Sequence, residues 1–227
     1  MNHLLKETAE ASTSASPNLS VFLYVVVTFM VLIFLLRALL GYRKYKESIF
    51  PHLYDNYLID YFYRINVLSD ASKSGLLKKL MGYHRLVYAN LSNKEGLLAV
   101  QTVTLIHSTG LLTIGYLSTH GTIKGGDKGD WYVKRTVEGK EKTYKLDNPV
   151  PYLREYERHL QTVLEDRTTQ KVLALSDDCD LSKVNPSIRV VRYSELEEVF
   201  KNADCGYGLS EAEIDEIFEK LGGKPEH

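Results

Sequence analysis

The stretch TVTLIHSTGLLTIGYLSTHGTIKGG, residues 102–126, decides the fold of this chain. Apolar and polar residues alternate on both sides of Ser108-Thr109-Gly110, which is a typical turn sequence, so the stretch predicts the two strands of a hairpin. A third short strand is expected over Gly121–Gly126. An antiparallel hairpin with one further strand therefore lies at the centre of the predicted fold.

Further elements are predicted on both sides of this hairpin. Upstream they are an amphipathic helix, a short helix and a first strand, over Glu47–Asp70, Leu76–Leu80 and His84–Leu91. Downstream, a second hairpin is predicted over Trp131–Val137 and Lys142–Leu146, followed by a helix capped by Asn148-Pro149. Two further strands are predicted over Lys171–Ser176 and Ile188–Tyr193. The capping boxes Ser194/Glu197 and Ser210/Glu213 then begin two helices, over Glu195–Asn202 and Glu211–Leu221. This order predicts an α/β domain with a mixed sheet flanked by helices.

An apolar run, LSVFLYVVVTFMVLIFLLRALL, occupies Leu19–Leu40. A bilayer core of about 30 Å needs roughly 20 such residues in a helix. Arg37 is the only charge in the run and lies close enough to its end to reach the headgroups. The run exceeds the apolar part of a cleaved signal peptide, and no small-residue cleavage site follows it. We therefore predict a single retained transmembrane helix over residues 19–41, with the membrane as the partner of Leu19–Leu40.

The cations around this run predict its orientation. Four of them lie at or after its end: Arg37, Arg43, Lys44 and Lys46. Only Lys6 lies well before it. The positive-inside rule then places the polar residues 1–18, a disordered tail, outside the cell membrane, and the rest of the chain in the cytoplasm. That cytoplasmic part divides into a main domain over 47–205 and a helical tail over 206–227.

Composition excludes several classes of function. Lysine and arginine number 28 against 29 aspartates and glutamates, so no overall field attracts a polyanion. The two cysteines, Cys179 and Cys205, lie far apart without CxxC spacing. A disulfide framework or zinc site is therefore not expected, and both thiols are predicted to be reduced.

From about Leu76 to Phe200 the pattern resembles the NERD (nuclease-related) domain, a branch of the PD-(D/E)XK restriction-endonuclease-like group. The resemblance rests on STGLLTIGYLSTHGTIKGG, on the strand that begins at Trp131, on the Asn148-Pro149 helix, and on the KVLALS and IRVVRY strands. It implies a restriction-endonuclease-like mixed sheet. It also implies a metal-dependent nuclease site with Asp, Glu and Lys on the hairpin and a glutamine on the Asn-Pro helix.

Every family position departs from that pattern. Aligned on Thr109-Gly110, the positions for Asp, Glu, Lys and Gln hold Thr102, Gly115, Leu117 and Tyr152. Nucleases of this group hold a divalent metal with carboxylates, and glycine or leucine neither binds Mg²⁺ nor activates water. We therefore predict no catalytic residues, no metal and no cofactor, and a lost nuclease site.

Other residues offer alternatives for chemistry. His107 and His120 bracket the hairpin but lack a strand carboxylate, and His159 on the Asn-Pro helix is interpreted as a packed or surface histidine. The acidic residues 177–180 are interpreted as a turn. An active Mg²⁺ nuclease remains the alternative if ligands have moved to Asp55, to Asp60 or to this turn.

The leading interpretation is thus a membrane-anchored, catalytically inactive nuclease relative that binds or scaffolds at the cytoplasmic face. Nucleic acid is one possible partner, through five cations that are interleaved with acids: Lys124, Lys128, Lys134, Arg135 and Lys142. A membrane protein is another, docking on the apolar face of the C-terminal helix formed by Ile214, Ile217, Phe218 and Leu221. The same face would equally pack on its own domain.

Overall fold

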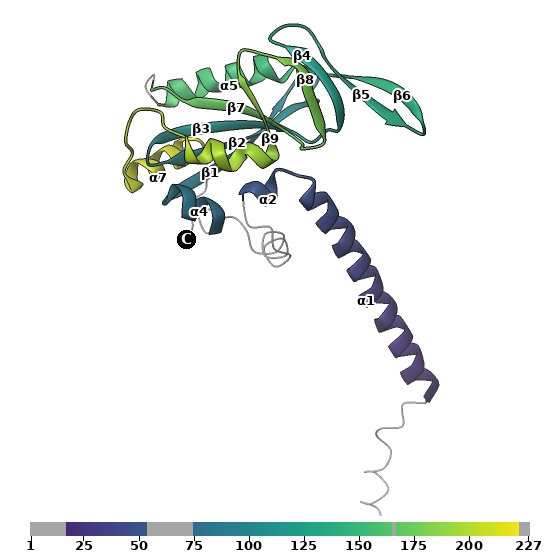
Figure 1. The fold of residues 1–227 in the computed structure, drawn as a ribbon. Coiled ribbons are helices and arrows are strands. Elements are labelled where there is room, and N and C mark those ends of the chain that lie inside the picture. The colour runs from purple at the N-terminus through teal and green to yellow at the C-terminus, as the bar shows by residue number, and fades with distance from the viewer. Residues whose placement is uncertain (1–16, 54–74, 165–166, 223–227) are drawn as a thin grey trace, which may run out of the picture. The chain divides into compact units, whose positions relative to one another are not determined.

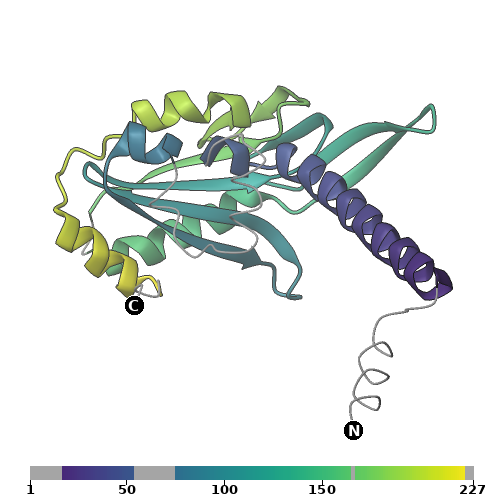
Figure 2. The ribbon, with the colours of Figure 1, turned by 90° about the horizontal axis from the view of Figure 1, so that it is seen from below.

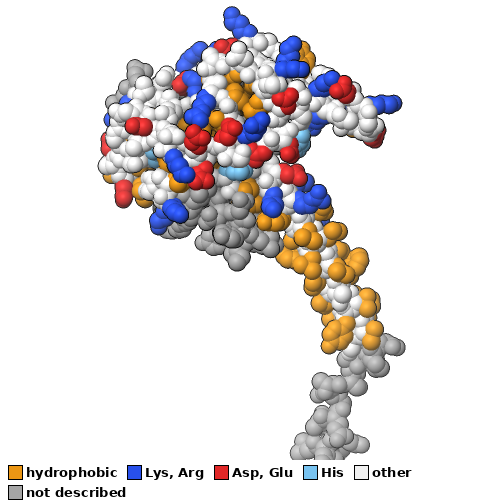
Figure 3. Space-filling view, viewed as in Figure 1, with side chains coloured by type: hydrophobic (Ala, Val, Ile, Leu, Met, Phe, Trp, Pro, Cys, Tyr) orange, Lys and Arg blue, Asp and Glu red, His pale blue; other side chains and the backbone are white. Residues whose placement is uncertain are grey.

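The structure is a computed structural model that describes residues 17–53, 75–164 and 167–222 (Figure 1). The chain divides into two units, Met1–Lys44 and Tyr45–His227. The first contains most of helix α1 (Pro17–Lys46). From Leu19 onward this helix has a mean hydropathy of 2.9 in its most apolar window, and none of that window is buried. Apolar side chains cover its visible side in Figure 3. Length and composition therefore allow α1 to cross a membrane.

The second unit is organised around a five-stranded mixed sheet in the order β1-β2-β3-β7-β9. Its strands are β1 (His84–Ser92), β2 (Leu98–His107), β3 (Gly110–Leu117), β7 (Gln170–Leu175) and β9 (Arg189–Arg192). β1, β2 and β3 are antiparallel, while β7 runs parallel to both β3 and β9. The predicted hairpin is confirmed, with His107 opposite Gly110 at its turn. The KVLALS run is likewise the buried parallel strand that its apolar sequence predicted.

Helices cover both faces of this sheet. Helices α5 (Pro149–Val163) and α7 (Glu211–Lys220) share an apolar cluster with the β2 and β3 side chains on one face. The other face packs against α2 (Phe50–Leu53), α4 (Gly75–Met81) and α6 (Leu196–Lys201), with the 3-10 turn η2 (Tyr193–Glu195) leading into α6. Figure 1 shows α5 on one side of the sheet and α2 and α4 on the other. The predicted α/β class, with a mixed sheet flanked by helices, is confirmed.

A second sheet has the order β6-β5-β4-β8. It contains β4 (Gly121–Gly126), β5 (Trp131–Val137), β6 (Lys140–Leu146) and β8 (Cys179–Asn185). β5 and β6 are joined by Glu138 and Gly139, both with positive φ, which gives the tight turn expected of a two-residue hairpin loop. Trp131 is fully buried, and a Cβ added at Gly125 would lie 2.3 Å from its ring, so glycine is required there.

Three sequence predictions need correction. Strand β8 was not predicted, since its residues were interpreted only as the end of an acidic turn. β6 begins at Lys140 rather than Lys142. The Ser194/Glu197 capping box is wrong: the backbone N–H and the hydroxyl of Ser194 both donate to Asp177 Oδ1, at 2.9 and 2.7 Å. The tertiary contact with Asp177 outcompetes the local cap. Of the helix predicted over 47–70, residues 54–70 lie outside the described part.

The other two predicted helix starts are confirmed. Ser210 caps α7, and its hydroxyl and Glu213 form the predicted capping box. The Asn148 side chain accepts from Val150 N at 3.0 Å and caps α5. The Asn148 amide also donates to the carbonyls of Gly126, Asp127 and Gly129. This one side chain therefore fixes both the helix start and the turn between β4 and β5.

We expect Asn148→Ala to destabilise the second unit by about 1–2 kcal/mol, because it removes the helix cap together with the bonds to the turn. The measurement is urea unfolding of the full chain in detergent, followed by fluorescence of Trp131, whose indole N–H donates to Gly126 O at 3.0 Å. Asn148→Asp is the matched control: it keeps the cap but loses the amide donor. If both variants lose the same stability, the turn bonds and not the cap carry the effect.

Candidate functional site

Two of the four family positions face each other in the structure. Thr102 on β2 lies directly opposite Gly115 on β3, and both side-chain positions point toward α5. Thr102 is fully buried, and its hydroxyl donates to the carbonyl of Ala89 at 3.2 Å. The hydroxyl is thus used within the sheet.

The space above Gly115 is filled by α5. A Cβ added at Gly115 would lie 2.7 and 2.8 Å from the two methyl carbons of Leu153, and Leu153 itself is 1% exposed. Leu117 and Tyr152 pack as partly buried neighbours on the same apolar cluster. Hydrocarbon therefore occupies the place where a metal and its water would need to lie.

One row further along the same face, the sheet carries polar side chains. The hydroxyls of Thr104 and Thr113 lie 3.3 Å apart, and Thr104 also donates to the Tyr156 hydroxyl of α5 at 3.3 Å. Beside them Lys171 of β7 forms a half-buried ion pair with Glu157 of α5. The sequence did not predict this pair, although both elements that carry it, the Asn-Pro helix and the KVLALS strand, were predicted. One carboxylate beside a lysine is a satisfied ion pair rather than a two-carboxylate metal site.

A groove of about 640 Å³ runs beside this row, between α5 and the end of β1. Tyr152, Glu155, Tyr156 and His159 line it from α5, at the spacing of one helix face. Asn90 and Lys94 contribute amide and ammonium groups from the β1 side. His159 is thus an exposed groove residue, as the sequence interpretation expected. The groove offers aromatic and polar groups for binding.

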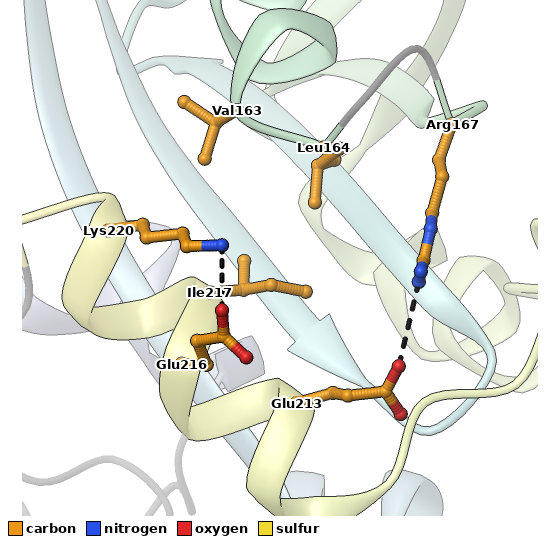
Figure 4. Close-up of a pocket in the computed structure, with 7 residues that line it drawn as sticks. All are labelled: Val163, Leu164, Arg167, Glu213, Glu216, Ile217 and Lys220. Carbon is orange, nitrogen blue, oxygen red and sulfur yellow. Dashed lines mark ion pairs between the residues drawn. The ribbon is translucent and has the colours of Figure 1, made fainter.

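A smaller pocket of about 220 Å³ lies between α5 and α7 (Figure 4). Its apolar floor is formed by Val163, Leu164 and Ile217, and its rim by two ion pairs that Figure 4 draws: Arg167–Glu213 at 3.9 Å and Lys220–Glu216 at 2.7 Å. The rim charges are thus matched within the pocket. The proposed docking face of the C-terminal helix packs here on its own domain: Ile214, Ile217, Phe218 and Leu221 all join the α5–α7 cluster.

The acidic residues 177–180 follow the end of β7, where Leu175 pairs with Leu117 of β3, and they make contacts of their own. Asp177 binds Ser194, and its other oxygen lies 4.0 Å from His52 Nε2 on α2. Asp178 lies 3.6 Å from His120 Nδ1, and Asp180 points outward from β8. Within the described residues, no three His, Cys, Asp or Glu side chains are close enough together to hold a metal. Asp55 and Asp60 lie outside the described part.

His107 and His120, which bracket the hairpin in the sequence, have different surroundings: His120 is exposed beside Asp178, whereas His107 is 1% exposed. His107 faces His84 across β1 and β2, and its Nδ1 accepts from the N–H of Thr109 at 3.3 Å. The Thr109 hydroxyl lies 3.0 Å from the same Nδ1 and donates to the carbonyl of Ala203. Burial and the neighbouring His84 lower the pKa of His107 to about 4. The ring is therefore neutral near pH 7 and acts as a structural acceptor.

Both thiols are held inside the second unit. Cys179 is buried and donates to Thr119 O, and Cys205 donates to Leu111 O. Burial raises the pKa of Cys179 to about 11 and also raises the pKa of Cys205. Neither cysteine is a thiolate nucleophile near neutral pH.

The structure separates the five cations proposed for nucleic acid. Lys124 and Lys134 project from one face of the second sheet. Arg135 and Lys142 project from the opposite face, where they lie directly opposite each other on β5 and β6. Lys128 lies in the turn between β4 and β5. Figure 3 shows cations and acids interspersed on the visible face. The five do not form one patch.

No family model, curated protein or solved structure matches this chain.

Proposed function

We propose that this chain is a single-pass membrane protein whose cytoplasmic NERD-like domain is a catalytically inactive nuclease relative that binds or scaffolds partners at the membrane face. The observation that carries the proposal is the contact between Gly115 and Leu153. A carboxylate side chain at position 115 would begin 2.7 Å from a methyl carbon of the buried Leu153, so the metal ligand of the proposed relatives fits there only if Leu153 moves. The antiparallel β1–β2–β3 unit followed by α5 and parallel β7 supports a restriction-endonuclease-like fold.

The anchoring part of the proposal is supported by α1. Its apolar residues are exposed, and the cations Arg43, Lys44 and Lys46 follow them in the sequence. The positive-inside rule then assigns the second unit to the cytoplasm.

Binding is supported by the groove between α5 and β1. It retains tyrosines, amides and charged groups although the position above Gly115 has been filled with hydrocarbon. Loss of the metal site with retention of the neighbouring groove is what a domain that binds without cleaving requires.

We expect the full chain in nanodiscs to cleave neither plasmid nor single-stranded DNA or RNA with Mg²⁺ or Mn²⁺ at neutral pH, because in the described part of the chain no three His, Cys, Asp or Glu side chains come together to hold a metal. The measurement is gel analysis after prolonged incubation at micromolar protein. The variants Asp55→Asn, Asp60→Asn and Asp177→Asn serve as controls for relocated ligands. Metal-dependent cleavage that any of them abolishes would establish the alternative, an active nuclease, and overturn the proposal.

A further inference from the structure

The β5–β6 hairpin sorts its charged side chains by face. Strand pleating places Arg135, Lys140, Lys142 and Tyr144 on one side, which we call the cationic face. Lys134, Glu141 and Lys145 are on the other side, the paired face. Residues 131–146 contain five cations and two acids in a chain of net charge −1, so this hairpin is a local concentration of positive charge.

On the paired face, acids neutralise the lysines. Lys134 lies 2.6 Å from Glu141, and Lys145 lies 2.9 Å from Asp130. These pairs give a structural reason for the charges on that side, and they leave little field for a ligand.

No such ion pairs account for the charges on the cationic face. Arg135 and Lys142 are directly opposite each other, an arrangement in which like charges repel and destabilise a hairpin. No acid on β5 or β6 shares this face: Glu138 lies in the turn at the tip. No ion pair with Lys140 or Lys142 occurs within the described residues. The fold places no carboxylate of β5 or β6 beside Arg135 and Lys142 on this face, so an anion outside the chain would reduce their repulsion.

The face is also pre-formed. The Arg135 guanidinium donates to His120 O and Thr119 Oγ1, at 3.0 and 2.6 Å, and lies 5.7 Å from the centre of the Tyr144 ring. Tyr144 is nevertheless 42% exposed. Figures 1 and 2 show β5 and β6 projecting from the rest of the domain. The cationic face is therefore accessible to a ligand with an extended, flat surface. Cations beside an exposed tyrosine are the composition found at bilayer interfaces.

We propose that the cationic face of the β5–β6 hairpin binds the anionic headgroups of the membrane to which α1 anchors the chain. The inference rests on the proposed anchoring. Each cation near an anionic surface raises binding roughly fivefold. Three such contacts are too few to hold a soluble protein, but they suffice for a domain whose tether keeps it at that surface. Three cations are likewise too few for tight binding of a free nucleic acid.

The test places tryptophan on either face of the hairpin in the full chain. Tyr144→Trp reports on the cationic face and Tyr132→Trp on the paired face, and the two tyrosines are equally exposed at 42%. Trp131, the one native tryptophan, is buried and gives a constant background. Each variant is placed in nanodiscs containing a lipid spin-labelled near the headgroup, either in phosphatidylcholine alone or with about one-third phosphatidylserine.

We expect phosphatidylserine to increase quenching of Tyr144→Trp roughly twofold or more at low salt, and high salt to reverse the increase. Tyr132→Trp should not respond. Adding Lys140→Glu and Lys142→Glu to Tyr144→Trp should abolish the response. Lys124→Glu with Lys183→Glu, an equal charge change on neighbouring strands at the paired side of the sheet, should preserve it.

The other outcomes separate the two proposals. If the chain does not remain with nanodiscs of either lipid, the anchor fails, and this inference fails with it. If the chain remains but Tyr144→Trp responds no more than Tyr132→Trp, only the headgroup contact is overturned. If single-stranded oligothymidylate changes Tyr144→Trp emission at the same salt and phosphatidylserine does not, the face binds nucleic acid and the lipid assignment is wrong.

Discussion

Replacing Gly115 by alanine should destabilise the second unit by about 1–3 kcal/mol, and replacing it by glutamate should cost more, because the larger side chain also brings a charge into an apolar site. The reason is the contact with Leu153, whose methyl carbons lie 2.7 and 2.8 Å from an added Cβ. A glutamate at position 115, the residue that the proposed nuclease relationship would require, is therefore expected to lower the stability of the domain. Urea unfolding of the full chain in detergent measures the loss.

A double-mutant cycle tests that cause. Leu153→Ala alone should cost about 2–5 kcal/mol by opening a cavity. Combined with Gly115→Ala, the new methyl group enters that cavity, so the double variant should be more stable than the sum of the two losses by about 1 kcal/mol or more. Gly126→Ala is the matched control, because its added Cβ meets only the carbonyl oxygen of Asn185, at 3.5 Å. Additive losses at positions 115 and 153 would show that Leu153 is not what excludes a side chain from position 115.

The central hairpin was predictable because its signal is local: alternation on both sides of a turn that ends in Gly110. Strand β8 was not, because its sequence CDLSKVN is polar and short, and it becomes a strand only by pairing with β4. The prediction that Ser194 caps a helix was wrong for the same reason. Its partner Asp177 comes from a distant part of the sequence, and no local pattern contains that information.

The residues of the candidate site were likewise predictable only in part. The sequence alone shows that the four positions where the nuclease resemblance implies Asp, Glu, Lys and Gln hold other residue types: Thr102, Gly115, Leu117 and Tyr152. The helix after Asn148-Pro149 was also predicted, but only the structure shows that its Leu153 fills the space above Gly115. The cations of the second hairpin look interleaved with acids along the chain, and it is the strand register that sorts them into a paired and an unpaired face.

Acid should destabilise the second unit through His107. The pKa of this buried histidine is lowered from 6.5 to about 4, because burial and the facing His84 disfavour its charged form, while Asp204 acts weakly in the opposite direction. The unfolded chain therefore binds a proton that the folded chain does not. The stability that the neutral ring contributes is full above pH 6.5 and is lost as the pH falls toward 4, by up to about 3 kcal/mol.

Unfolding of the full chain in detergent by urea, at several pH values from 7 to 5, measures this slope. Between pH 7 and 5 histidines dominate the slope, and His52, whose pKa is also lowered by burial, contributes to it beside His107. The carboxylates with lowered pKa values (Asp127, Asp180, Glu197 and Glu213) contribute mainly near and below their ordinary values of 3.8 and 4.5. In His107→Gln the amide oxygen can still accept from Thr109, and we expect most of the slope to disappear. His159→Gln, at an exposed groove position, should retain it. An unchanged slope in His107→Gln would assign the acid sensitivity to another group, because only a titrating side chain produces a pH-dependent free energy of unfolding.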